Sequence, residues 1–538
     1  MSIERSKRKD LKPLSPPSKT GTRPGSDLPT LRPSGVGSEA TSAEPFNLVN
    51  LSYSYGKEPD EEISVIYATS TSDVGATTRE PVTTPESLAN GEDPPSFGQE
   101  SEKRAKKEAK DKELLTSDRW LVRNGHFLTF VGLYLFSVMV LFRPYEIVPG
   151  LGFLSATAFY FAAATLAIYL PSQLVAESNL TMMSTEVKAI LALTAFALLT
   201  MPIAKDFATA WDKFNDPFVK AVMIFIVMVN VIRTRKRLMQ VMWLSIGIAV
   251  YLAFAALNMY MNGQMTVEGY RVAVDVGGMF GNPNEMAMHF VMMTPIVIAI
   301  GLASKSSLMR AACFIMAALF IGANMVTFSR GGFLGLLAVA AVLAWKLGRK
   351  HRMNVTLASA VIGGLILIAA PGNYGLRMLS IFIPALDPVG SSNQRQELLE
   401  RSIQVTLRNP WGIGIGCFPI VSIHNLQTHN AFTQVSTELG ILGLVAYLVF
   451  MISPFRKLGA IERTLFKDDK IDWYYYLAIG LQASLIGYMV SSFFAAVAYN
   501  WFIYYMVAYA VAFRRIYSQE TGVEKGANAA QFREAQPA

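Results

Sequence analysis

The amino-acid sequence predicts an all-α protein that crosses a membrane with about twelve helices. Hydrophobic residues make up 52% of the 538 residues and charged residues only 16%, which is too apolar for an ordinary soluble protein. The apolar residues occur in blocks of roughly 17–24, and a helix of that length spans the ~30 Å hydrocarbon core of a bilayer. Basic residues cluster beside these blocks as topology signals, so the net charge of +8 does not indicate nucleic-acid binding.

The N-terminal region is predicted to be distinct from the membrane domain. Residues 1–100 are rich in Ser, Thr, Pro, Gly and Glu without an apolar period, which predicts a disordered tail that extends to about residue 120 and lacks a cleavable signal peptide. Ser101–Leu115 is expected to form a charged, solvated helix. Its lysines either flank the first span or lie against anionic lipid headgroups. Residues 121–516 are expected to form the membrane domain and 517–538 a C-terminal tail.

The apolar blocks place the spans near residues 127–143, 151–170, 187–204, 216–233, 237–260, 285–303, 308–327, 331–347, 354–371, 431–453, 473–494 and 497–514. The short basic loops between them all fall on one side, together with the stretch before the first span and the arginines that follow the last. The positive-inside rule therefore places both termini in the cytoplasm. The long segment 372–430, before the tenth span, then lies on the outer side, where we expect any chemistry to occur.

Arginines on the outer side are exceptions to the positive-inside pattern. Arg330 lies in TFSRGGFLGL, a turn so short that the side chain must lie near the bilayer surface, either as a snorkelling anchor or as an anion-binding group. Arg271 lies in a glycine-rich segment before the sixth span, which is either an ordinary loop or the lining of a cavity. Asn282 and Asn284 flank a proline there and are positioned to cap the helix that follows.

The outer segment 372–430 contains a predicted amphipathic helix at Ser391–Leu407. Leu399, Ile403 and Leu407 repeat at i, i+4 and i+8, which indicates one apolar face. We expect this helix to lie flat on the membrane surface, over the spans. Glu397 and Arg401 are spaced for an i, i+4 ion pair, which leaves Arg395 less obviously neutralised.

The polar start of the tenth span supplies a candidate base. His429 and Asn430 lie where the chain enters the bilayer, and Glu438 follows within the helix. A histidine at such a place is more often structural than catalytic, but the outer arginines lie on the same side. Several cations beside one base suit a diphosphate-bearing lipid, because guanidinium groups bind phosphate oxygens bidentately and histidine can accept a proton from a hydroxyl. We expect no metal and no disulfide.

Four motifs resemble the O-antigen ligase and polysaccharide polymerase family of bacterial membrane proteins. They are GMFGNPNEMA (278–287), TFSRGGFLGLLA (327–338), QRQELLERSIQVTLRNPWGIGIGCF (394–418) and THNAFTQVSTELGILGL (428–444). Their order, the helix number and the long outer segment before the last motif all fit. The resemblance covers roughly residues 120–515.

The resemblance implies a GT-C-like glycosyltransferase in the bacterial inner membrane, with its active site on the periplasmic face. Such enzymes move a glycan from an undecaprenyl-diphosphate carrier to an acceptor, without a cofactor. The acceptor is lipid A–core in ligases, another carrier-linked repeat in polymerases and protein in related transferases; ligase and polymerase stay undistinguished here. The N-terminal tail is not a family feature and would suit binding of a cytoplasmic partner.

The resemblance also implies residue roles. Arg330 and Arg271 match positions thought to hold the carrier diphosphate, and His429 matches the histidine proposed to activate the acceptor hydroxyl. Arginines would then supply the charge stabilisation that a divalent cation gives elsewhere. We expect Arg395 to join the diphosphate site. The residues expected to line the substrate are Asn282, Asn284, Asn430 and Glu438.

Two other classes of protein compete with this interpretation. A transporter or flippase for an anion or a lipid-linked sugar would place ionisable groups near the bilayer midplane on broken helices, often with an internal repeat. Here the unusual charges lie at the outer ends of the spans and no repeat is evident, which favours the enzyme. A non-catalytic scaffold of a polysaccharide secretion complex, recruited through the tail, is the third hypothesis.

Overall fold

The computed structural model describes residues 124–522 except 149, 155–156, 178, 275, 277–279, 350–352, 354–356, 358–362, 365–373, 382 and 384–390. The predicted disordered tail, its charged helix at Ser101–Leu115, most of the expected span 354–371 and the end of the C-terminal tail lie outside these residues. In the described part, all regular structure is helical, apart from a single β-bridge between Val267 and Arg271. The predicted all-α class is confirmed.

Apolar helices dominate the described residues. The long helices are α3 (Thr157–Glu177), α4 (Thr185–Leu199), α6 (Lys220–Val231), α7 (Arg235–Met261), α8 (Pro283–Ala303), α9 (Ser307–Val326), α10 (Arg330–Leu347), α16 (Gly440–Lys467), α17 (Trp473–Ser492) and α18 (Trp501–Thr521). The helix α13 (Ser391–Arg408) is also long but amphipathic. Short elements are η1 (Val138–Phe142), α2 (Pro144–Ile147), η2 (Gly152–Leu154), η3 (Met201–Ile203), α5 (Phe207–Lys213), η4 (Phe214–Val219), α12 (Tyr374–Leu379), α14 (Phe418–Val421), η6 (Ile423–Asn425) and α15 (Ala431–Glu438).

Nine helical segments within the described ranges are long and apolar enough to cross a membrane. They coincide with the first eight predicted spans and with part of the tenth. The helices α17 and α18 occupy the last two predicted spans but do not belong to the nine. An integral membrane protein is therefore supported, whereas a total of twelve spans stays a prediction.

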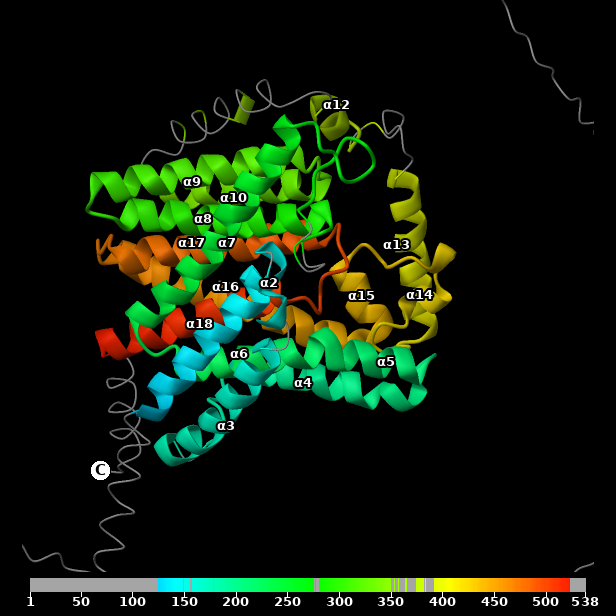
Figure 1. The fold of residues 1–538 in the computed structure, drawn as a ribbon, viewed down its shortest axis with the longest axis horizontal. Coiled ribbons are helices and arrows are strands. Elements are labelled where there is room, and N and C mark those ends of the chain that lie inside the picture. Colours follow the sequence, from blue (N-terminus) through cyan, green and yellow to red (C-terminus); the bar gives the residue numbers. More distant parts are fainter. Residues whose placement is uncertain are drawn as a thin grey trace, which may run out of the picture. The chain divides into compact units, whose positions relative to one another are not determined.

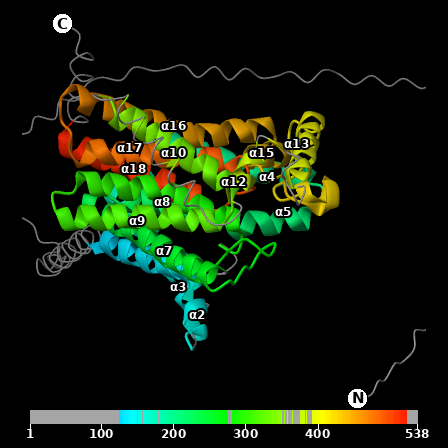
Figure 2. The ribbon, with the colours of Figure 1, turned by 90° about the horizontal axis from the view of Figure 1, so that it is seen from above.

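The helix α8 packs against α7, α9, α10 and α17, while α16 packs against α4 and α17. Figures 1 and 2 show α12, α13 and α15 gathered at one end of this helix bundle. We call it the loop-rich end. The helices α8, α10, α16 and α18 all begin there, so the start of each is directed toward the same region.

Buried ion pairs lie at the opposite ends of α10, α16 and α18. The carboxylate of Glu186 is fully buried and lies 2.8 Å from Arg514. Glu462 is also fully buried, with Lys346 at 2.8 Å and Arg349 at 2.7 Å. An unpaired buried charge would cost several kcal/mol, so these pairs fix the helix ends with respect to each other.

The prediction of the tenth span as one helix over residues 431–453 was wrong in its first part. The chain forms two helices there, because α15 ends at Glu438 and α16 begins at Gly440. Gly440 has a φ of 76°, and a Cβ atom at this position would lie 2.5 Å from the carbonyl oxygen of Pro410. The backbone of Gly414 donates to the Glu438 carbonyl over 3.0 Å. A loop that docks on the end of α15 therefore takes over its carbonyl groups and ends the helix.

The predicted outer helix exists as α13, and its placement on the membrane surface stays a prediction. Leu398 and Val405 are 1% and 5% exposed, and α13 packs against α15. Ile403 and Leu407, which the sequence pattern assigned to the apolar face, are 47% and 74% exposed. The packing against α15 thus sets the orientation of α13 and, with it, the position of Arg395.

Candidate active site

A cavity of about 220 Å³ at the loop-rich end brings together four of the predicted site residues, three of them charged or titratable and the fourth Asn430. Arg330 is the first residue of α10, Arg395 lies in the second turn of α13, and His429 precedes α15. The cavity is lined by these three residues together with Ile381, Gln396, Leu399, Thr428, Asn430, Phe493 and Phe494. Three segments far apart in the sequence therefore converge on one small space with two guanidinium groups and an imidazole.

Arg330 is held by the cap of its helix. The Ser329 hydroxyl accepts a hydrogen bond from the backbone N–H of Gly332 over 3.1 Å and donates one to Asn284 Oδ1 over 2.9 Å. Arg330 itself is 8% exposed. The preceding Phe328 has a φ of 51°, which is rare for a bulky residue. A turn fixed at both sides therefore presents Arg330 to the cavity.

Arg271 lies behind this turn and does not line the cavity. Its Nε donates to the carbonyl of Thr327 over 2.9 Å, and its Nη2 donates to Asn284 Oδ1 over 2.8 Å. A carboxylate oxygen of Glu268 lies 3.8 Å from Nη1. Burial and the neighbouring cation Arg377 lower the pKa of Arg271 to about 10. Arg271 thus remains charged near neutral pH and positions the turn before Arg330.

Arg377 is a further arginine at this turn that the prediction from the sequence did not include. Arg377 donates from Nε to the carbonyl of Phe328 over 2.9 Å, and its guanidinium lies 4.8 Å from the ring centroid of Tyr270, whose hydroxyl it also contacts. Arg377 and Arg271 therefore clamp the same turn. The signal was available, because Arg377 is an outward arginine by the same positive-inside argument that singled out Arg395.

His429 is half-buried and adopts an uncommon backbone conformation, with a φ of 50°. The next residue, Asn430, caps α15, since its Oδ1 accepts from the backbone N–H groups of Phe432 and Thr433 over 2.9 and 3.1 Å. Burial and the nearby charge of Arg395 lower the pKa of His429. The imidazole is therefore neutral near pH 7 and able to accept a proton.

The remaining predicted residues have mainly structural contacts. Asn282 caps α8 by accepting from the backbone N–H of Asn284 over 2.9 Å. Glu438 is fully buried, near the N–H of Phe418, and burial raises its pKa to about 7. Of the four residues expected to line the substrate, only Asn430 lines the 220 Å³ cavity. Substrate contacts of the other three stay a prediction.

Within the described ranges, no group of three or more His, Cys, Asp or Glu side chains is arranged to hold a metal ion. The charged groups that line the cavity are instead the arginines Arg330 and Arg395. Such a set suits a polyanionic group, because each guanidinium can donate two parallel hydrogen bonds to phosphate oxygens.

The O-antigen ligase family model matches residues 313–448. This segment runs from α9 into α16 and contains Arg330, Arg395 and His429. This part of the chain is similar to the O-antigen ligase family. The O-antigen ligase match supports a membrane glycosyl-transfer enzyme of the ligase or polymerase type, which uses a lipid-linked glycan and an acceptor. No curated protein matched the chain.

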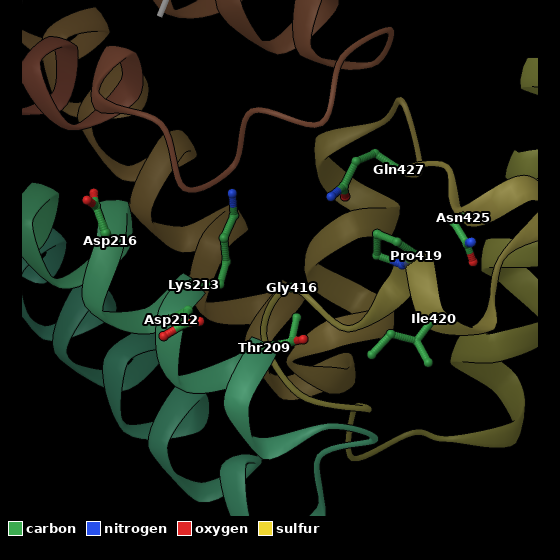
Figure 3. Close-up of a pocket in the computed structure, with 9 residues that line it drawn as sticks. All are labelled: Thr209, Asp212, Lys213, Asp216, Gly416, Pro419, Ile420, Asn425 and Gln427. Atoms are coloured by element: carbon green, nitrogen blue, oxygen red, sulfur yellow. The ribbon is translucent and has the colours of Figure 1, made fainter. Parts of the chain in front are cut away.

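A second cavity has a volume of about 670 Å³ and adjoins the first along the chain, since Gln427 lines it and Thr428 lines the first; it was not predicted from the sequence. Figure 3 shows α5 and η4 on one side of it and the segment 416–427 on the other. It is lined by Thr209, Asp212, Lys213, Asp216, Gly416, Pro419, Ile420, Asn425 and Gln427. Of the wall residues on α5 and η4, Asp216 falls in the predicted span 216–233, and the other three lie in the predicted loop before it, which was assigned no role.

Proposed function

We propose that this protein transfers a glycan from an undecaprenyl-diphosphate carrier to an acceptor hydroxyl, in the 220 Å³ cavity and on the periplasmic side of the inner membrane. The observation that carries the proposal is the meeting of Arg330, Arg395 and His429 in one cavity inside the family match. Ligase and polymerase chemistry are the same at this centre, so the proposal covers both.

The arginines bind the diphosphate of the donor. Arg330 and Arg395 line the cavity and offer planar, charged donors to the phosphate oxygens. Arg271 keeps the Arg330 turn in place and adds positive potential from behind. The first turns of α10 and α15 also start at the cavity, and helix N-termini favour an anion. The same groups stabilise the charge that develops on the leaving diphosphate, and no metal is needed for it.

His429 acts as the general base. Its neutral imidazole accepts the proton of the acceptor hydroxyl while the hydroxyl oxygen attacks the anomeric carbon. The new glycosidic bond forms as the bond between the anomeric carbon and the diphosphate oxygen breaks, and undecaprenyl diphosphate leaves with the electron pair. A single displacement inverts the anomeric configuration. The proton on His429 is then lost to water.

Two substitutions test these roles. His429→Ala is expected to lower transfer by about 10²–10⁴, the usual contribution of a positioned base. Arg330→Ala is expected to lower it by roughly 10²–10³, as when a transition-state donor is removed elsewhere. Transfer is measured with the purified protein and a radiolabelled carrier-linked glycan, with protein amount and membrane insertion checked for each variant.

Matched controls are available on the same segments. His424→Ala removes an exposed histidine, and Arg408→Ala removes an exposed arginine from the last turn of α13. Both controls should retain full transfer. Full activity of His429→Ala and Arg330→Ala would refute the proposed roles. In a deletion strain, single-repeat products would indicate a polymerase, and full-length chains left on the carrier would indicate a ligase.

A further inference from the structure

The 670 Å³ cavity has the chemical character of a carbohydrate site. Its polar lining consists of carboxylates, a hydroxyl, amides and one ammonium group, which together can donate to and accept from sugar hydroxyls. Pro419 and Ile420 supply apolar surface for the faces of sugar rings. The volume lies within the range of specific small-molecule sites, roughly 300–1,000 Å³.

The charges of this cavity differ from those of the arginine-lined cavity. Asp212 and Asp216 are acidic, and Lys213 is the one basic residue of its lining. Asp216 forms an ion pair with Lys220 at 2.8 Å. The charge of Lys213 acts on the buried carboxylate of Glu438, where it opposes the rise in pKa caused by burial. The lining therefore attracts an anionic ligand only weakly, whereas it suits a neutral sugar or an amino sugar.

A close approach of two backbone segments forms the floor of the cavity. Gly416 has a φ of 76°, and a Cβ atom there would lie 2.8 Å from both Cβ and Cγ of Lys213. Only glycine lets the stem of Lys213 pass this point. In Figure 3 the side chains of Lys213 and Gln427 project from opposite sides toward the space between the two walls.

One short segment separates the two cavities. Gln427 lines the larger cavity, and the next two residues, Thr428 and His429, line the smaller one. We propose that the larger cavity binds the acceptor glycan, as a neutral or amino sugar, and places its hydroxyl at His429. This assignment rests on the proposed function, in which His429 takes the proton of the acceptor.

Thiol protection tests the acceptor site without requiring transfer. Ile420 lines the cavity and is 49% exposed, and both native cysteines, Cys313 and Cys417, are buried. The measurement is the rate at which maleimide labels the introduced thiol of the full-length Ile420→Cys protein in nanodiscs. Four ligands are compared: chitosan tetramer as the amino sugar, chitin tetramer as the neutral sugar, tetragalacturonate as the anionic sugar, and glycan-free undecaprenyl diphosphate. A ligand at ten times its Kd should slow labelling about tenfold.

The assignment predicts protection by the amino or the neutral tetramer, but not by tetragalacturonate or undecaprenyl diphosphate. Adding Asp212→Arg to Ile420→Cys should abolish the protection. Leu407→Cys, 74% exposed on α13, provides the matched control and should label at the same rate with every ligand. Unchanged labelling of Ile420→Cys with both sugars, or equal protection by undecaprenyl diphosphate, would overturn the assignment.

Failure of this inference is distinguishable from failure of the proposed function. If His429→Ala abolishes transfer but no sugar protects Ile420→Cys, the acceptor site is wrong and the donor site stands. If sugars protect Ile420→Cys while His429→Ala retains full transfer, the larger cavity binds sugar but the proposed base is wrong. A transfer assay of Asp212→Arg adds the kinetic test, since the KM for the acceptor should rise with the KM for the donor unchanged.

Discussion

Asn284 connects the two arginine-bearing turns, and its replacement separates folding from catalysis. Its Oδ1 accepts one hydrogen bond from Arg271 over 2.8 Å and one from the Ser329 hydroxyl over 2.9 Å. A hydrogen bond to a charged group contributes about 1.5–3 kcal/mol and a neutral one about 0.5–1.5 kcal/mol. Asn284→Ala should therefore lower the free energy of unfolding by about 2–4.5 kcal/mol, because a buried guanidinium loses one of its acceptors and the Ser329 hydroxyl loses another.

Asn284→Asp is the matched variant, because a carboxylate keeps both acceptor functions. An aspartate in the first turn of α8 is also favoured by the helix dipole, so stability should be retained. The added negative charge beside Arg271 weakens the positive potential at the cavity. We expect the donor KM to rise about tenfold, which corresponds to roughly 1.4 kcal/mol of lost attraction.

The assay compares thermal unfolding in detergent with steady-state transfer for the parent protein and both variants. The expected result is an unstable Asn284→Ala and a stable Asn284→Asp with weaker donor binding. Equal stability of the alanine variant and the parent would refute the structural role of Asn284. A stable aspartate variant with an unchanged donor KM would show that the potential around Arg271 does not reach the donor.

Two further predictions concern the base and the helix break. The pKa of His429 lies below the ordinary value for histidine, so kcat/KM should fall with decreasing pH only below pH 6.5. Arg395→Gln removes the nearby positive charge and should move this acidic limb of the pH profile to higher pH. An acidic limb that stays in place in an active Arg395→Gln variant would contradict the assignment of His429 as the base. Gly440→Ala should destabilise the protein by at least roughly 1–2 kcal/mol, since its left-handed φ and the carbonyl of Pro410 oppose a side chain. Gly322→Ala, with open space around it, is the control, and equal melting temperatures of the two variants would show that the break tolerates a side chain.

The sequence was informative wherever the bilayer imposes a simple rule. Apolar length defined the first eight spans to within several residues, as for α8, expected at 285–303 and found at Pro283–Ala303. The same rule failed at the tenth span, because the apolar run does not reveal that Gly440 adopts a left-handed φ. That conformation depends on the docking of the loop at Pro410, which is a tertiary contact.

The arginines show a similar limit. The predicted topology placed Arg271, Arg330 and Arg395 on the outer side of the membrane. On that basis each of the three was an equally good candidate to bind the diphosphate of the donor. Hydrogen bonding distinguishes them, since Arg271 donates to Thr327 and Asn284 and lies behind the turn, whereas the other two line the cavity. Which guanidinium reaches a cavity depends on side-chain partners that the pattern of charges does not contain.

The two turns that carry the proposed chemistry share one local arrangement. In each, a residue with positive φ is followed by a helix cap: Phe328 before Ser329, and His429 before Asn430. Ser and Asn are preferred cap residues, but the left-handed residues before them carry no such signal, because left-handed backbone conformations cost about 1–3 kcal/mol and persist only where the surroundings fix them. At α10 Arg330, the proposed diphosphate ligand, follows the cap, and at α15 His429, the proposed base, precedes it. The two helix starts thereby face one cavity with a cation from one side and a base from the other.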